Sequence, residues 1–153
     1  MNATKTSLAV AALENGTVID HIPSAALFRV VRLLGIENMH TGVTIGNNLP
    51  SSRQGHKGII KLEGVEFDSD TLDRIALLAP EATVNIIRNY GVYSKTTVSL
   101  PAELRGIVRC SNPKCITNHE PMDTRFEVIG REPVTLRCCY CHHTIKGEEA
   151  EII

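Results

Sequence analysis

Tryptophan is absent from this 153-residue sequence, and the aromatic content is only 4%. Any hydrophobic core must therefore consist mainly of valine, isoleucine, leucine and alanine. No apolar run approaches the roughly 20 residues of a membrane-spanning helix. The apolar stretch Ser7–Leu13 is short and is followed at once by Glu14, which is atypical of a signal peptide. We expect no membrane association and a cytoplasmic location.

Net charge is also nearly absent, because 16 basic side chains face 17 acidic ones. Residues 1–109 carry eleven basic and ten acidic side chains, and residues 110–153 carry five and seven. Neither part is a basic arm, which argues against sequence-independent binding to nucleic acid or anionic membranes. The hydrophobic content of 42% is typical of a globular protein.

Cysteine is missing from the first 109 residues, and all five cysteines lie between Cys110 and Cys141. This asymmetry marks a boundary between a larger N-terminal domain and a small cysteine-bearing one. We place the boundary near Pro101, which gives predicted domains at residues 1–100 and 101–153.

The cysteines form two pairs, Cys110-x₄-Cys115 and Cys138-x₂-Cys141, separated by 22 residues. Two such knuckles supply the four soft ligands of a tetrahedral zinc site, and Cys139 is then the spare thiol. Two disulfides are the alternative, but they need an oxidising compartment and leave one thiol over. A closed four-sulfur site leaves no position for water, so the predicted metal is structural. A segment of about 44 residues needs such a metal to fold.

Hydrophobic periodicity predicts an α+β fold with a ferredoxin-like, split βαβ sheet, both of its helices on one face. A small β-rich zinc domain is expected to follow. The sequence predicts strands at 8–13, 17–22, 41–47, 58–63 and 82–90, helices at 23–34 and 68–79, a loop reading NNLPSSRQG and a connector at 92–109.

Catalytic and nucleotide-binding motifs are largely missing: the sequence has no G-x-x-x-x-G-K-[ST], G-x-G-x-x-G, G-x-S-x-G or H-E-x-x-H. Asp20 and His21 could suggest an acid–base pair, but neighbours on a strand point to opposite faces. We favour Asp20 beside the N-terminus of the next helix and His21 as a partly buried hydrogen-bonding residue. Lys57 and Lys61 share a strand face, about 13 Å apart. They are either solvated or, with Lys95 if the fold brings it near, a polyphosphate site.

Three stretches, GTVIDHIP, TIGNNLPS and APEATVNIIRNY, stand in this order before the C-x₄-C and C-x₂-C pairs. This combination resembles the regulatory chain family of aspartate carbamoyltransferase over essentially the whole sequence. The resemblance implies a non-catalytic subunit in pyrimidine biosynthesis. Its N-terminal domain would bind the allosteric effectors ATP, CTP and UTP, and its zinc domain would dock onto a separate catalytic chain. The implied assembly joins two catalytic trimers through three regulatory homodimers.

The resemblance also implies roles for individual residues. Asp20 would contact the ribose or base, Lys57 and Lys61 the ribose and phosphate region, and Lys95 the phosphates. Further pocket-lining positions are His21, Val10, Leu13, Val18, Ile59, Asn85, Tyr90 and Val92. The implied zinc ligands are Cys110, Cys115, Cys138 and Cys141.

Two other functions are alternatives to this one. A zinc-ribbon adaptor for nucleic acid would bind with a steep salt dependence, which the acidic excess after residue 109 disfavours. An independent nucleotide-processing enzyme would need turnover by this chain alone, and no residue set suggests a mechanism.

Overall fold

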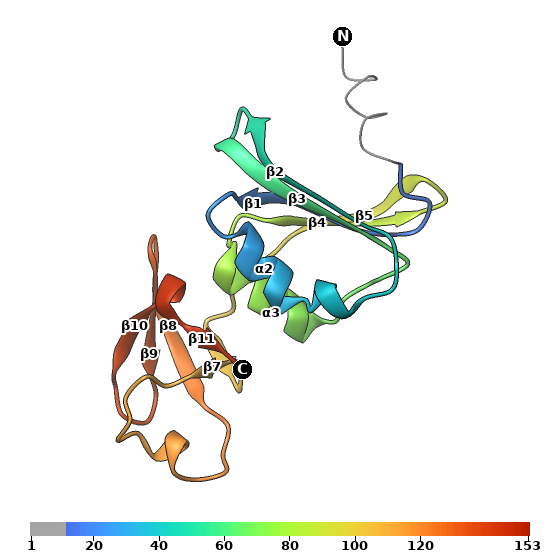
Figure 1. The fold of residues 1–153 in the computed structure, drawn as a ribbon. Helices are drawn as coiled ribbons and strands as arrows, with labels where there is room; N and C mark the ends of the chain where they lie inside the picture. Colours follow the sequence, from blue (N-terminus) through green and yellow to red (C-terminus); the bar gives the residue numbers. More distant parts are fainter. Residues whose placement is uncertain (1–11) are drawn as a thin grey trace. The chain divides into compact units, whose positions relative to one another are not determined.

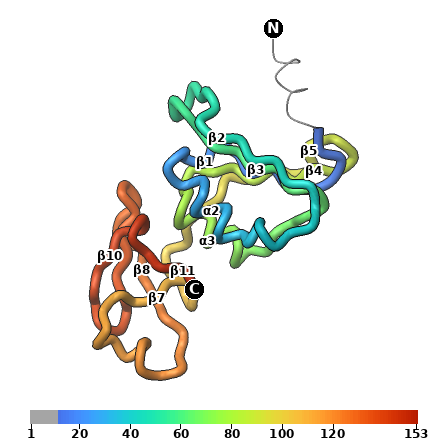
Figure 2. Tube along the Cα trace, viewed as in Figure 1, coloured from blue at the N-terminus to red at the C-terminus, as the bar shows by residue number. Residues whose placement is uncertain are grey.

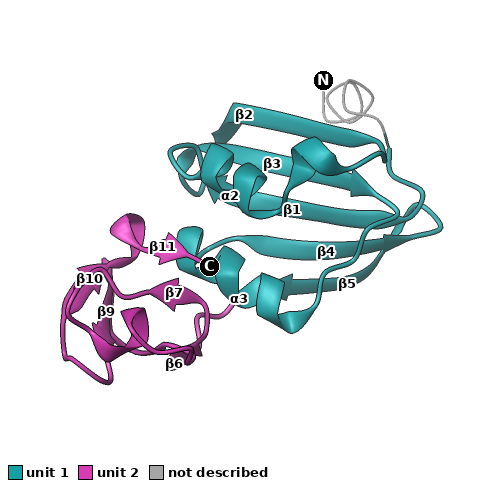
Figure 3. Cartoon of the chain, turned by 60° about the horizontal axis from the view of Figure 1, so that its bottom comes forward, with its two compact units in different colours: residues 1–98 teal, residues 99–153 magenta. Residues whose placement is uncertain are grey.

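Residues 12–153 are described by the computed structural model, and the chain divides into two units, Met1–Val98 and Ser99–Ile153 (Figure 3). The strand predicted at 8–13 lies mostly outside the described residues, and Ala12 and Leu13 are not in a strand. No helix among residues 12–153 has the length and apolar character needed to span a membrane.

The first unit is a five-stranded sheet, ordered β2-β3-β1-β4-β5, in which every neighbouring pair is antiparallel. Its elements are β1 (Gly16–Pro23), α2 (Leu27–Leu33), the 3₁₀ turn η1 (Ile36–Asn38), β2 (Val43–Ser51), β3 (Gly55–Glu63), α3 (Ser69–Leu78), β4 (Thr83–Arg88) and β5 (Gly91–Thr97). β3 lies between β1 and β2, which therefore run parallel, and α2 and α3 lie on the same face of the sheet (Figure 1). The predicted split βαβ fold is confirmed.

Side chains of β3 alternate between two environments. Gly58, Ile60 and Leu62 are buried, whereas Lys57 and Lys61 are only partly covered. The buried side packs on α2, since a Cβ at Gly58 would lie 2.9 Å from Cδ1 of Leu27. We call the opposite side, which carries Lys57 and Lys61, the open face.

The first helix begins later than predicted. Pro23 is the last residue of β1, and α2 starts at Leu27 after a turn closed by the bond from Ala26 N to Pro23 O (2.8 Å). Proline suits this strand end because it has no N–H to offer a neighbour. The second helix has a side-chain cap at its start, since the Asp68 carboxylate accepts a hydrogen bond from Thr71 N.

The predicted loop NNLPSSRQG is instead most of a β-hairpin. β2 continues through Pro50 to Ser51, and β3 begins at Gly55. Pro50 is tolerated because β2 is the edge strand of the sheet. A register shift between Gly46 and Leu49 absorbs one extra residue. The sequence interpretation missed this strand because turn-forming residues usually indicate a loop. The same residues are also compatible with a bulged edge strand.

The predicted connector at 92–109 also contains strands. β4 ends at Arg88, and the chain turns at Asn89 and Tyr90, both with positive φ (52° and 65°), into β5 (Figure 2). Two residues with positive φ form the tight turn that suits the twist of a hairpin. β5 is polar because it is an edge strand, so it lacks the apolar pattern used to predict strands.

The second unit is β-rich, as predicted. It holds a four-stranded sheet, β10-β9-β8-β6, and a two-stranded one, β11-β7. Phe126, Leu136 and Leu104 are buried at its centre. Its elements are β6 (Glu103–Arg105), β7 (Val108–Arg109), η2 (Ile116–Asn118), β8 (Arg125–Arg131), β9 (Val134–Cys138), β10 (Thr144–Lys146), η3 (Gly147–Glu149) and β11 (Glu151–Ile152).

Candidate functional site

Four thiols of the second unit converge on one point. The sulfurs of Cys110, Cys115, Cys138 and Cys141 all lie within 4.8 Å of one another. Sγ of Cys110 is 3.6 Å from that of Cys141, and Sγ of Cys115 is 3.8 Å from that of Cys138. A regular tetrahedron with metal–sulfur bonds of about 2.3 Å has edges of about 3.8 Å. The cluster therefore has the dimensions of a four-sulfur zinc site.

Short loops position these thiols. Cys115 N donates to Asn112 O (3.0 Å), which closes the first knuckle, and His142 N donates to Cys138 O (2.9 Å), which closes the second. Cys139 lies between two cluster members but outside the cluster, and its N–H is bonded to Arg125 O. The x₂ spacing therefore brings the expected pair together.

Burial and mutual contact perturb the thiol pKa values. Burial raises the pKa of Cys110 and of Cys138. Burial also opposes ionisation of Cys141, but hydrogen bonds from Asn112, His143 and the neighbouring thiols outweigh it and lower the pKa to about 7. A metal ion requires thiolates, so its binding here must release protons and weaken as the pH falls.

Residues from four strands, three of them polar, form one row on the open face of the first unit. Lys61 of β3 is paired with Val18 of β1, Val18 with Asn85 of β4, and Asn85 with Lys95 of β5. Directly opposed residues in a sheet have Cβ atoms about 5 Å apart. The sheet order thus brings Lys95 to the same face as Lys61. The sequence alone could not decide whether the fold brings these lysines together.

A β-bulge places Asp20 and His21 on the same face. The pairing of β1 with β3 shifts between Ile19 and Ile22, and His21 has a positive φ of 59°. Its Nδ1 is 3.2 Å from Oγ1 of Thr83, a residue on the same side of β4 as Asn85. The expected alternation of the two side chains is therefore wrong, because the bulge interrupts the two-residue period.

Asp20 forms an ion pair with Lys57, with Oδ1 2.9 Å from Nζ. It does not cap α2, whose N-cap Ala26 has no side-chain hydrogen bond, so the helix-start role predicted for Asp20 is wrong. His21 is a partly buried hydrogen-bonding residue, as expected. Burial lowers its pKa, and the nearby lysines lower it further, while Asp20 opposes them.

Lys61 and Lys95 differ from Lys57 in having no ion pair within residues 12–153. Lys61 is partly buried and Lys95 exposed on the open face. Within the described residues neither ammonium group is held in an ion pair, so both can contact an anionic ligand.

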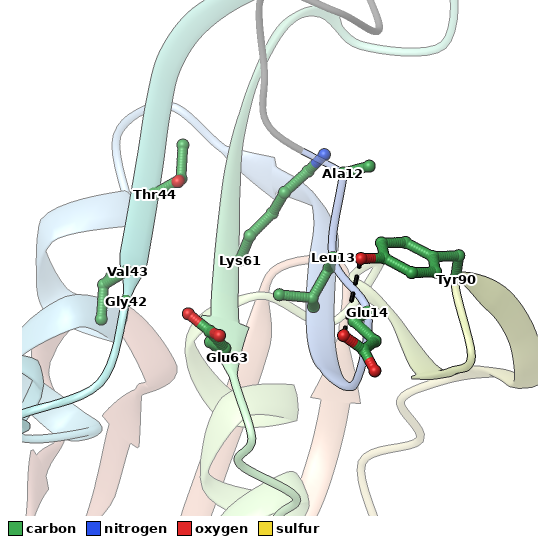
Figure 4. A pocket seen from close by; sticks show the side chains of 9 residues that line it. All are labelled: Ala12, Leu13, Glu14, Gly42, Val43, Thr44, Lys61, Glu63 and Tyr90. Carbon is green, nitrogen blue, oxygen red and sulfur yellow. Dashed lines mark hydrogen bonds between the residues drawn. The ribbon is translucent and has the colours of Figure 1, made fainter.

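A cavity of about 330 Å³ opens at one end of the open face (Figure 4). Three of the sequence-predicted residues line it, namely Leu13, Lys61 and Tyr90. The sequence interpretation missed its other lining residues, which are Ala12, Glu14, Gly42, Val43, Thr44 and Glu63. Glu63 could have been found, because it is two residues after Lys61 on a predicted strand and so faces the same way.

The remaining predicted positions are spread over the same unit. Ile59 lies between the two lysines of β3, and Val92 of β5 is exposed and paired with Ile87. Tyr90 is 68% exposed at the β4–β5 turn, where its N–H donates to Glu14 O. Val10 lies outside the described residues.

Two models of known protein families match this sequence, one in each unit. The aspartate carbamoyltransferase regulatory chain, allosteric domain, matches residues 8–99, and the metal binding domain of the same regulatory chain matches residues 102–151. The chain belongs to the aspartate carbamoyltransferase regulatory chain family. Its members are regulatory chains, so it is a regulatory, non-catalytic subunit with an allosteric and a metal-binding domain, as the resemblance predicted.

Individual relatives support this membership over the full length. The regulatory chain of Parabacteroides distasonis is 54% identical over 145 residues, covering 95% of this chain and 94% of its own. That of Bacteroides fragilis is 52% identical over 153 residues and covers all of both chains. The regulatory chain of Thermococcus gammatolerans is 46% identical over 143 residues and covers 93% of this chain and 95% of its own.

Proposed function

We propose that the first unit binds the nucleoside triphosphates ATP, CTP and UTP on its open face. The second unit holds one structural zinc ion and docks onto the catalytic chain of aspartate carbamoyltransferase. Nucleotide binding then biases the catalytic chain between states of lower and higher activity. The subunit works in the cytoplasm, where reduced thiols are available to a metal.

The cross-strand row of Lys61, Val18, Asn85 and Lys95 carries this proposal. An apolar residue lies between a lysine and an amide, with a second lysine at the end. A nucleotide needs the same sequence of contacts: apolar surface for the base, hydrogen bonds for the sugar, and cations for the phosphates. Lysine acts on phosphates as a point charge from a flexible stem.

The bulge at Asp20 and His21 contributes further polar groups to this face. The Asp20 carboxylate accepts hydrogen bonds, as a ribose hydroxyl requires. Its ion pair with Lys57 has both side chains 20% exposed, so it is held within the protein but accessible to a ligand. Lys57 can then turn from Asp20 toward a phosphate, with little net change in charge pairing.

The cysteine cluster supports the structural-zinc part of the proposal. Cys110, Cys115, Cys138 and Cys141 would hold the ion in a closed sphere, which fixes the loops around it. Ile116 and Tyr140 are 52% and 39% exposed beside these loops. Exposed apolar side chains next to a rigid metal knuckle suit a protein partner, here the catalytic chain.

Allosteric control requires that each effector bind the two states of the complex with different affinity. The proposed assembly of two catalytic trimers and three regulatory dimers provides such states. The nucleotide site and the docking site lie in different units of one chain, so the coupling is between two distinct sites.

Calorimetric titration with CTP and with cytidine tests the nucleotide assignment. Lys95→Ala should weaken CTP binding about tenfold, the size of one charge-assisted hydrogen bond at an exposed site, and leave cytidine unaffected. Lys114→Ala, in the second unit, is the matched control. Equal losses for CTP and cytidine, or unchanged CTP affinity, would remove Lys95 from the phosphate site.

The docking assignment is tested on the complex itself. The chain is co-purified with the catalytic chain and treated with a thiol-reactive mercurial, while released metal and the size of the complex are followed. Zinc and the catalytic chain should be released together. A complex that stays intact after complete metal loss contradicts docking through the metal-bearing unit.

A further inference from the structure

The hydroxyl of Thr117, in the 3₁₀ turn η2, contacts one sulfur of the cysteine cluster. Its Oγ1 lies 3.2 Å from Sγ of Cys115, the buried residue that ends the first knuckle, residues 110–115. A sulfur that binds a metal ion is a thiolate without a hydrogen, so the hydroxyl must donate and the sulfur accept. Hydrogen bonds to ionised acceptors are stronger than those between neutral groups. This contact therefore favours the metal-binding form of Cys115 over the free thiol.

The other three sulfurs of the cluster accept hydrogen bonds from the backbone. The donors include the N–H groups of Asn112, Cys141 and His143. At Cys115 a side-chain hydroxyl takes this role, and a single substitution can remove it without changing the backbone. Thr117 therefore allows the contribution of one hydrogen bond to one sulfur to be measured.

The side chain of Asn118 joins two backbone carbonyls of the first knuckle. Its Nδ2 donates to Cys110 O (2.9 Å) and to Asn112 O (2.8 Å). The next side chain acts in the same way, since Nε2 of His119 donates to Pro113 O (2.8 Å), which can only accept. The first knuckle has four residues between its cysteines and the second has two, and a longer loop loses more conformational entropy when it is fixed. Asn118 restricts the longer loop by tying its start to η2.

We propose that Thr117 and Asn118 are positioning residues of the metal centre. Thr117 stabilises the ionised sulfur of Cys115, and Asn118 holds the first knuckle in the conformation that binds the ion. This inference rests on the proposed structural zinc and names groups outside the four cysteines that determine its affinity. The same bonds fix η2, whose first residue, Ile116, is 52% exposed. The two side chains thus also hold part of the proposed docking surface in place.

Zinc affinity of the full chain, measured by competition with a chromogenic chelator, tests the role of Thr117. Thr117→Val replaces the hydroxyl by a methyl group and should weaken zinc binding about tenfold, as is typical when a group that hydrogen-bonds to a metal ligand is lost. Thr117→Ser keeps the hydroxyl and should bind zinc as the wild-type chain does. Thr135→Val is the matched control, because Thr135 Oγ1 donates over the same 3.2 Å to Pro133 O, outside the cluster. It should leave the affinity unchanged.

Loading the full chain with Co²⁺ provides a readout that a general loss of stability does not change. A cobalt–thiolate centre absorbs light by transferring charge from sulfur to metal, and this transition needs less energy when the sulfur donates more readily. Thr117→Val should therefore shift the absorption to longer wavelength, and Thr117→Ser should restore it. Thr135→Val should absorb at the wild-type wavelength.

Asn118→Ala separates the shape of the knuckle from the electronic state of the sulfur. The variant loses two bonds to carbonyl oxygens and none to a sulfur. It should weaken zinc binding about tenfold and leave the cobalt absorption at the wild-type wavelength.

The outcomes separate this inference from the metal centre beneath it. The role of Thr117 is overturned if Thr117→Val keeps wild-type zinc affinity, loses it without a shift in absorption, or shares its loss with Thr117→Ser. The role of Asn118 is overturned if Asn118→Ala binds zinc as tightly as the wild-type chain. Each of these results leaves the four-cysteine centre standing, whereas a wild-type chain that binds no zinc overturns both.

Discussion

Cys138 and Cys139 are neighbours in sequence, yet only one belongs to the metal cluster. Cys138 is fully buried, with its sulfur 3.8 Å from that of Cys115, whereas Cys139 is outside the cluster. Substituting each by serine changes one atom at adjacent positions. We expect Cys138→Ser to disrupt the metal site and Cys139→Ser to leave it intact.

The size of the effect follows from the four equivalent ligands. A structural zinc contributes about 10–16 kcal/mol of apparent binding free energy, so each thiolate accounts for about 2.5–4 kcal/mol. A loss of about 3 kcal/mol corresponds to a decrease in zinc affinity on the order of a hundredfold. For a unit this small, it should also lower the melting temperature by more than about 10 °C.

Competition with a chromogenic chelator measures the affinity, elemental analysis the metal content, and circular dichroism the melting of each variant. Cys139→Ser should match the wild-type chain in all three. The four-sulfur assignment is refuted if Cys138→Ser keeps one metal ion per chain at wild-type affinity. It is also refuted if Cys139→Ser loses the ion.

Two further predictions concern the first unit. Gly16→Ala should destabilise it by more than about 3 kcal/mol in urea unfolding, because φ is +148° and the new Cβ would lie 2.1 Å from Leu62 O. Gly64→Ala, with φ of +70° and no atom within 4 Å, should cost only about 1–2 kcal/mol, and equal effects would contradict the steric argument. Because the His21 pKa is lowered on folding, the unfolded chain binds that proton more tightly, so stability should fall as the pH drops below about 6.5. His21→Asn should flatten this dependence between about pH 7.5 and 5.5, and an unchanged slope would rule out His21 as its source.

Local features of this chain could be predicted from the sequence. The two cysteine pairs fold into knuckles through bonds that span only a few residues, such as Cys115 N to Asn112 O. The helix capped by Asp68 was equally local. Lys57 and Lys61 share a face because a strand repeats every two residues.

Features that depend on strand pairing could not be predicted in this way. β5 is polar and exposed, and only its pairing with β4 makes it a strand. The bulge at Asp20 and His21 exists because β1 has one residue more than β3 over the same length. Neither feature produces a hydrophobic periodicity in the sequence of its own segment.

The sequence by itself determined which residues can bind metal and which strands and helices alternate, since spacing and periodicity act over a few residues. The tertiary structure alone decided that Lys95 joins Lys61 across Val18 and Asn85, and that Glu63 faces a cavity near Tyr90. These residues are separated by tens of positions along the chain. Their distances depend on the order and register of the strands, which the packing of the whole sheet fixes.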